Sequence, residues 1–181
     1  MTELFEKSIR TLELPRVLGL LAEQAVSAEA KRRALALTPE TEPEGTQGTE
    51  TASDGAVELG GYSLLGMLRI PEAKLELPVM SEWSYPLLAA APCRYSGSLA
   101  GGDLVILGHS YRTHFRCLRT IQPGAAVELT DAGGETHRYT VAEVETVRES
   151  DSAALTGNWP LTLFTCTADR RHRVLVRCGN A

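Results

Sequence analysis

The first 37 residues carry apolar side chains at helical spacing. One stripe falls at i, i+3, i+4, i+7 and i+11, as in an amphipathic helix, and consists of Leu14, Val17, Leu18, Leu21 and Ala25. Pro15 suits the first turn of this helix, and Ser27 can cap a second helix that ends before Pro39. Two helices alone cannot bury both apolar faces, so we expect residues 1–37 to dock on another part of the protein.

The helical pattern disappears in residues 38–61. This segment is rich in Thr, Glu and Gly and has no aromatic residue. It contains six acidic residues but no Lys or Arg. Like charges repel one another, and such a composition cannot bury an apolar core. We therefore predict an acidic, flexible linker.

From Tyr62 onward the apolar residues occur in short runs that are typical of strands. The predicted strands are 66–70, 75–79, 104–107, 126–130, 138–147, 161–165 and 174–178. Residues 131–134 read Asp-Ala-Gly-Gly, a hairpin turn in which glycine supplies the positive φ. Residues 113–121 are predicted to form a short helix. Many short strands between turn signals predict a mainly β domain over residues 62–181, built as a closed barrel or a sandwich.

Length, charge and cysteine spacing narrow the class of protein. A chain of 181 residues with 43% hydrophobic residues can fill one domain and an appendage. The net charge of −5 argues against a surface that binds nucleic acid. The four cysteines form no Cys-x-x-Cys pair, which argues against a zinc knuckle, and we expect no structural disulfide. Apolar runs are far shorter than the ~20 residues that span a bilayer, and charges interrupt the N-terminus, so neither a transmembrane helix nor a signal peptide is predicted.

Three residues with complementary chemistry are expected at the ends of predicted strands. Cys166 ends one strand, Arg173 opens the next, and His109 follows an upstream strand. A cysteine nucleophile needs a base or an imidazolium partner, and it needs donors where the oxyanion forms. Singly, each residue is more often structural: the Cys in a core, the His as a hydrogen-bonded surface or core residue, and the Arg on a solvated rim. Their joint pattern predicts a site for thiol acyl transfer.

The run Thr162-Leu163-Phe164-Thr165-Cys166, with Arg173 before Val-Leu-Val, resembles the motif of sortases. These are cysteine transpeptidases of Gram-positive cell surfaces. Other similar segments are 66–71 and 77–79 at the start of the barrel, 108–115 with Leu118 around the histidine, and 124–130 with 139–141 in the middle hairpin. The resemblance covers about residues 62–178.

The resemblance implies a closed eight-stranded β-barrel with a short helix, and a two-step acyl transfer. Cys166 would attack the Thr–Gly bond of a Leu-Pro-x-Thr-Gly-like sorting signal and form a thioester. His109 would protonate the leaving amine and then deprotonate the acceptor, an amine of a cell-wall precursor or a pilin lysine. Arg173 would hold the substrate and stabilise the oxyanion, helped by Thr165. His114 is the alternative to His109.

Other features of this chain bear on the resemblance. The loop between Cys166 and Arg173 is short, which predicts a substrate groove that is more open or narrower than usual. Trp83 and Tyr85 are candidates to line that groove, although packing is the commoner role of such aromatic residues.

Calcium dependence, known in some sortases, needs clustered carboxylates. The candidate ligands, which a solvated strand edge explains equally well, are Glu143, Glu145, Glu149 and Asp151. No other cofactor is predicted.

The N-terminal segment resembles a different family. Residues 5–40 are similar to the N-terminus of the MutS-like DNA-repair proteins of the second type. The chain has no Gly-x-x-x-x-Gly-Lys-Ser/Thr loop to hold phosphates, so a repair ATPase is excluded. Sortases usually reach the membrane through an N-terminal transmembrane helix, which this chain replaces with the helical leader. We interpret the chain as a natural or artificial fusion whose leader contributes nothing to catalysis, and the family implies an extracytoplasmic cell-surface location.

The leading hypothesis is therefore a cysteine transpeptidase that acts on a protein with a C-terminal sorting signal and on an amine acceptor. One alternative is a non-catalytic module that binds a peptide or docks a partner. Another is a thiol protease that only hydrolyses its substrate. The three differ in whether a thioester forms and in what accepts the acyl group.

Overall fold

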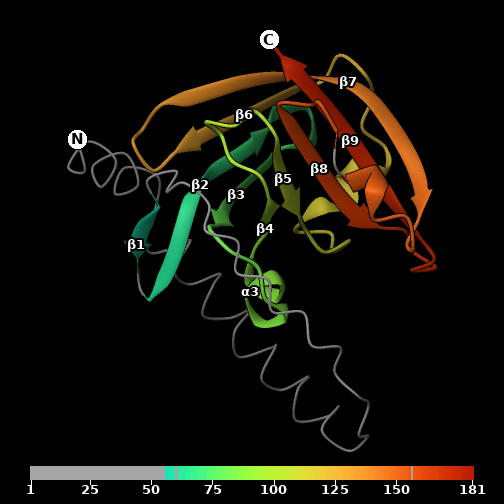
Figure 1. The fold of residues 1–181 in the computed structure, drawn as a ribbon, viewed down its shortest axis with the longest axis horizontal. Helices are drawn as coiled ribbons and strands as arrows, with labels where there is room; N and C mark the ends of the chain where they lie inside the picture. The colour runs from blue at the N-terminus through green and yellow to red at the C-terminus, as the bar shows by residue number, and fades with distance from the viewer. Residues whose placement is uncertain (1–55, 60, 156) are drawn as a thin grey trace, which may run out of the picture.

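The computed structural model describes residues 56–59, 61–155 and 157–181. The predicted leader (1–37) and most of the predicted linker (38–61) lie outside these residues. The described chain is mainly β (Figure 1). Its elements are β1 (Val57–Leu59), β2 (Tyr62–Ile70), η1 (Pro71–Ala73), β3 (Leu75–Met80), α3 (Tyr85–Ala90), β4 (Cys93–Ser96), β5 (Leu104–Leu107), η2 (Phe115–Arg119), β6 (Ala126–Asp131), β7 (Thr136–Arg148), η3 (Ala153–Leu155), β8 (Leu161–Cys166) and β9 (His172–Asn180), where η marks a 3-10 turn.

Eight of the strands close into a barrel. They are hydrogen-bonded in the order β2-β3-β4-β5-β8-β9-β7-β6, and β6 pairs back to β2. The β3–β4 and β5–β8 pairs are parallel, and the other pairs are antiparallel. β1 adds a ninth strand at the edge of β2. The predicted closed eight-stranded β-barrel is thus confirmed.

Side-chain alternation separates the barrel interior from the outer face. The interior holds one large buried cluster that includes Ile106, Leu163 and Val176. The intervening residues Phe164 and Leu175 belong to a second cluster, which we assign to the outer face. Successive strand residues point to opposite faces. Residues at the end of β8 therefore face outwards when they are in phase with Phe164.

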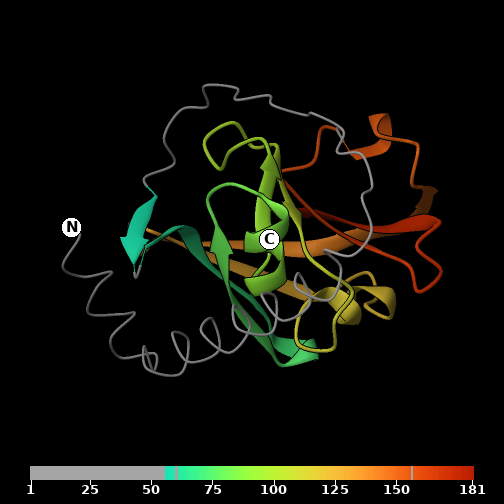
Figure 2. The same ribbon diagram turned by 90° about the horizontal axis from the view of Figure 1, so that it is seen from below.

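The short helix α3 covers one end of the barrel, as two perpendicular views show (Figures 1 and 2). Ser84 starts it, because its Oγ accepts a hydrogen bond of 3.3 Å from the Leu87 N–H, and Pro86 occupies the first turn. The helix and the ends of the adjacent strands bury a small cluster made of Leu64, Met80, Leu88, Ala90, Ala91 and Cys93.

Several elements differ from the sequence predictions. β1 falls within the predicted linker, where Val57–Leu59 pairs with Tyr62, Ser63 and Leu64 of β2. Gly61, at a φ of +83°, allows the chain to reverse there. α3 and β4 were not expected, and the helix predicted at 113–121 is only the 3-10 turn Phe115–Arg119. That turn closes with the Thr120 N–H on the Cys117 carbonyl, shortly before a proline that cannot continue a helix.

Candidate active site

Cys166 and Arg173 are direct partners in the β8–β9 ladder. Directly opposite residues of an antiparallel pair have Cβ atoms about 4.5–5.5 Å apart on the same face. Cys166 is in phase with Phe164, so both side chains face outwards. The guanidinium carbon of Arg173 lies 5.8 Å from the centroid of the Phe164 ring. The structure therefore brings the predicted thiol and guanidinium groups together on the outer face.

His109 follows the end of β5, the parallel neighbour of β8. Leu107 is in register with Phe164, and the Gly108 N–H donates a hydrogen bond of 3.1 Å to the Phe164 carbonyl. His109 lies two residues after Leu107, and Cys166 lies two residues after Phe164. His109 is therefore level with Cys166. The three predicted catalytic residues therefore come from adjacent strands at one end of the barrel.

The segment after β5 is fixed by close packing. The Phe115 N–H donates a hydrogen bond of 3.0 Å to the His109 carbonyl. The imidazole of His109 lies 4.7 Å from the ring of Tyr111, centroid to centroid. A Cβ atom at Gly108 would lie 2.5 Å from Cδ2 of Phe115, so any larger residue would displace that ring or the strand end. Glycine at this position therefore helps to place His109.

Burial dominates the ionisation of the Cys166 thiol. Burial raises its pKa above the ordinary value of 9.0. The charge of Arg173 lowers the pKa, the Glu149 carboxylate raises it, and Arg170 lowers it to a smaller extent. The thiolate is thus a minor species at neutral pH, and Arg173 is the neighbouring charge that favours it most.

Thr165 has the opposite orientation to Cys166. Its side chain is fully buried, in phase with Leu163, and its Oγ1 has no hydrogen-bond partner within the described ranges. Ser110 Oγ and His114 Nδ1 are the other buried side-chain atoms without a partner in this part of the chain. Buried polar atoms are almost always paired. The three unpaired atoms lie close to the predicted catalytic residues in the sequence. Ser110 and His114 are within five residues of His109, and Thr165 precedes Cys166.

His114, the alternative base, is 1% exposed and lies with its ring 5.5 Å from that of Tyr111. Burial and, to a smaller extent, the charge of His109 together lower its pKa from 6.5 to about 4. The imidazole of His114 is therefore neutral at physiological pH and enclosed by protein. The half-buried His109 has the better access to a substrate.

Four aromatic rings run outwards from the thiol and form what we call the aromatic band: Phe164, Tyr95, Trp83 and Tyr85. Successive ring centroids are 5.3, 5.9 and 5.8 Å apart. Trp83 is 41% exposed and Tyr85 is 76% exposed. Both side chains therefore present part of their rings to solvent while they contact neighbouring rings. The band joins an exposed aromatic surface to the residue two positions before Cys166, a connection that only the folded structure reveals.

The short turn between β8 and β9 is held by its own side chains. Asp169 accepts hydrogen bonds from the Thr167 hydroxyl and the Arg171 N–H, the latter at 3.1 Å. The Thr167 N–H donates to the His172 carbonyl at 2.9 Å. Arg170 lies in the left-handed region at a φ of +59°. These contacts hold the connection between Cys166 and Arg173 in a compact shape.

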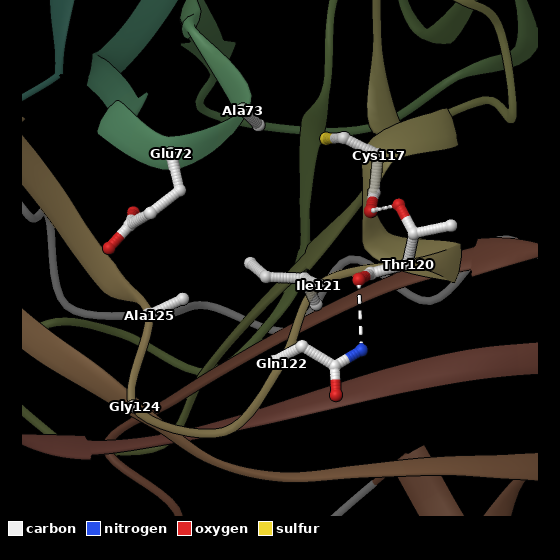
Figure 3. Close-up of a pocket in the computed structure, with 8 residues that line it drawn as sticks. All are labelled: Glu72, Ala73, Cys117, Thr120, Ile121, Gln122, Gly124 and Ala125. Atoms are coloured by element: carbon white, nitrogen blue, oxygen red, sulfur yellow. Dashed lines mark hydrogen bonds between the residues drawn. The ribbon is translucent and has the colours of Figure 1, made fainter.

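The pocket in Figure 3 belongs to a different part of the molecule. It has a volume of about 390 Å³ and is lined by Glu72, Ala73, Cys117, Thr120, Ile121, Gln122, Gly124 and Ala125. Burial raises the pKa of the Cys117 thiol, which lies at its edge. These eight residues include no cation or imidazole that would activate the thiol.

The four acidic residues considered as calcium ligands do not converge. Glu145 accepts a hydrogen bond of 2.8 Å from Arg177 instead. Within the described residues, three ligand atoms come within 4.8 Å of one another only at Asp131, Glu135 and His137, on the β6–β7 turn. There Asp131 accepts from the Glu135 N–H and pairs with His137, each at 2.9 Å, so these contacts need no ion. The acids at 143–151 do not fit a calcium site.

Comparison with protein-family models matches residues 68–181 to the Sortase domain. The chain belongs to the sortase family. The match runs from within β2 through β9 and includes His109, Cys166 and Arg173. A comparison with curated proteins finds no match. The similarity of residues 5–40 to MutS-like proteins lies outside the described residues and stays a prediction.

Solved sortases share the fold of this sortase domain. Sortase A from Corynebacterium diphtheriae, a lid mutant, is 27% identical with a TM-score of 0.58, over 65% of this chain and 70% of that one. Sortase C1 from Streptococcus agalactiae is 25% identical with a TM-score of 0.61, over 68% and 70%. Clostridium perfringens sortase C with the C-terminal cell wall sorting motif is 20% identical with a TM-score of 0.58, over 65% and 70%. Among the described elements, no helix has the length and apolar character to cross a bilayer.

Proposed function

We propose that this sortase is a cysteine transpeptidase that cleaves a Leu-Pro-x-Thr-Gly-like sorting signal and transfers the acyl group to an amine. The observation that carries this proposal is the direct pairing of Cys166 with Arg173, beside the strand end that bears His109. The sortase C of Clostridium perfringens has been solved with a C-terminal sorting motif, and we extend that substrate class to the present chain.

In the first half-reaction the Cys166 thiolate attacks the carbonyl carbon of the Thr–Gly bond. The Arg173 guanidinium, on the same face, stabilises the oxyanion of the tetrahedral intermediate. The C–N bond then breaks, the leaving amine takes a proton from His109, and a thioester links the peptide to Cys166. The expected help from Thr165 has no support in this geometry, because its fully buried side chain faces the barrel interior, away from the face that carries Cys166 and Arg173.

In the second half-reaction an amine of a cell-wall precursor or a pilin lysine attacks the thioester. His109 takes the proton of the attacking amine, an amide bond forms, and the C–S bond breaks to restore the thiolate. The raised pKa of the Cys166 thiol makes Arg173 important in this step too, since the guanidinium also favours the departing thiolate. We expect no cofactor in this reaction, and membership of the sortase family supports a location at the extracytoplasmic cell surface.

The aromatic band supports a peptide as the substrate. Its exposed rings offer apolar faces on the same side of the barrel, and aromatic side chains bind proline and aliphatic residues at little cost in conformational entropy. Phe164, which is 2% exposed, supports the band from below at the end next to Cys166, and Trp83 and Tyr85 provide the exposed end. A peptide that lies along the band would bring its C-terminal residues to the thiol.

Incubation with a Leu-Pro-x-Thr-Gly peptide and an amine acceptor tests the proposal. Formation of the peptide–amine product supports the transpeptidase. Hydrolysis without transfer would favour the thiol protease. The non-catalytic peptide-binding module predicts binding with neither thioester nor product, and that result would overturn the proposal.

A further inference from the structure

Arg177 is a buried cation on the outer face of the barrel. It lies on β9, in phase with Leu175, and is 4% exposed. Removing a charge from water costs several kcal/mol unless hydrogen bonds replace the lost solvation. The groups that accept hydrogen bonds from the buried guanidinium must therefore offset the cost of its lost solvation.

Each partner of Arg177 comes from a different element. Its Nε donates to Oε1 of Glu145 on β7 at 2.8 Å, and its Nη1 donates to the Thr162 hydroxyl on β8 at 3.2 Å. Its Nη2 donates to the carbonyl of Ala154 in the 3-10 turn η3. The rigid fork of a guanidinium suits such a three-way contact, which a lysine could not reproduce.

The contact with Ala154 holds an element that no backbone ladder holds, unlike the contacts with Glu145 and Thr162. β7 and β8 are already held to β9 by continuous backbone ladders. The η3 turn belongs to no ladder, and it is the middle of the connection between β7 and β8. Among the partners of Arg177, therefore, η3 is the one whose position depends most on this side chain.

The η3 turn in turn touches the surface beside the thiol. Leu155, which is 2% exposed, belongs to the outer cluster that also contains Val105, Phe164 and Leu175. Tyr95 packs partly against the same cluster. One ring of the aromatic band, Phe164, thus belongs to the cluster that Leu155 completes, and a second, Tyr95, packs against it.

We propose that Arg177 is a positioning residue that fastens η3 to the sheet and so shapes the peptide-binding surface beside Cys166. The proposal rests on the function proposed above for that surface. It assigns Arg177 no contact with the reacting atoms. Loss of Arg177 should weaken peptide binding through η3 while the thiol chemistry at Cys166 continues.

The test compares Arg177→Met with Arg69→Met. Arg69 also pairs with a glutamate across neighbouring strands, at 3.0 Å from Glu128, but its side chain is 56% exposed. A third variant, Arg177→Met with Glu145→Gln, removes the carboxylate that the first variant leaves without its partner. The readouts are KM and kcat for a Leu-Pro-x-Thr-Gly peptide, the rate of Cys166 alkylation by iodoacetamide, and amide hydrogen exchange over residues 149–160.

We expect both Arg177 variants to raise KM about tenfold, a free-energy change of about 1.4 kcal/mol. Their kcat and alkylation rate should stay close to those of the wild type, and exchange should increase over 153–155. Arg69→Met should change none of these. Unchanged exchange in a folded Arg177 variant would overturn the anchoring role, and faster exchange with an unchanged KM would overturn the effect on binding. If the wild type turns over no peptide, the function proposed for Cys166 fails, and the exchange measurement alone decides the anchoring.

Discussion

Cys166 and Cys117 are the two half-buried thiols of the molecule, and they differ in charge and position rather than in burial. Burial raises the pKa of both. Cys166 ends a strand beside Arg173, whereas Cys117 lies within η2 and its thiol donates to the His114 carbonyl at 3.8 Å. The pocket is at Cys117, yet the groups that activate a thiol are at Cys166. The shape of a hollow therefore does not by itself identify a catalytic cysteine.

Replacing each thiol in turn should have the largest effect. Cys166→Ala should reduce turnover of the sorting-signal peptide by about a thousandfold or more, because no nucleophile is left. Cys117→Ala should leave turnover within about twofold and cost about 1 kcal/mol of stability from lost packing. Steady-state kinetics, with melting temperatures as the folding control, measure both. Comparable losses in the two variants would remove the distinction between the thiols.

Replacing the guanidinium group is expected to have the next largest effect. Arg173→Met should lower kcat by about a hundredfold, since oxyanion donors are worth about that much. Arg119→Met, at the end of η2 near Cys117, serves as the matched control and should stay within about twofold of the wild type. Single-turnover kinetics of thioester formation would show the loss directly. A normal rate in Arg173→Met would contradict its assignment as an oxyanion donor.

His114 lies between the two regions, and its titration predicts a pH-dependent stability. The folded imidazole has a pKa of about 4, below its ordinary value of 6.5. The unfolded chain therefore binds more protons between these values, so the unfolding free energy should fall as the pH drops from about 6.5 to about 4. The contribution of His114 is on the order of 3 kcal/mol.

Urea denaturation of the wild type and of His114→Gln at several pH values in this window provides the measurement. The variant should be less stable at neutral pH and lose less stability on acidification. Parallel curves for the two proteins would show that His114 does not stay neutral in the folded state.

The smallest expected effect concerns the charges around Cys166. The alkylation rate of this thiol should rise steadily with pH up to about 9, because its pKa is raised and only the thiolate reacts. At a fixed pH, Glu149→Gln should speed alkylation a few-fold and Arg173→Met should slow it, since each removes the charge that shifts the pKa in the opposite direction. Peptide mapping distinguishes Cys166 from Cys117, whose rate should not change in either variant. A slower reaction in Glu149→Gln would reverse the assigned role of that carboxylate.

The sequence predicts the parts of the fold that depend on local pattern. The runs 104–107, 161–165 and 174–178 are apolar and end at clear polar or turn residues, so the ends that carry His109 and Cys166 were found correctly. α3 and β4 were missed, because residues 81–96 mix short apolar and polar stretches. A signal was present there in Ser84 and Pro86, a cap and a first-turn proline.

The remaining features depend on contacts between residues far apart in the chain. The inward orientation of Thr165 follows from the phase of β8 relative to the barrel interior, which a single strand does not reveal. The aromatic band joins Trp83 to Phe164 through Tyr95, three residues from separate segments. Arg177 reads as an ordinary strand residue until its three partners are brought around it.

Intact-protein mass spectrometry shows whether Cys166 carries the acyl group from one amine to another. The enzyme is mixed with a Leu-Pro-x-Thr-Gly peptide, without an acceptor, and quenched in acid. We predict a mass increase equal to the peptide acyl fragment, located on Cys166 by digestion and removed when an amine is added. An adduct on Cys117, or no adduct while the peptide binds, would rule out Cys166 as the acyl carrier.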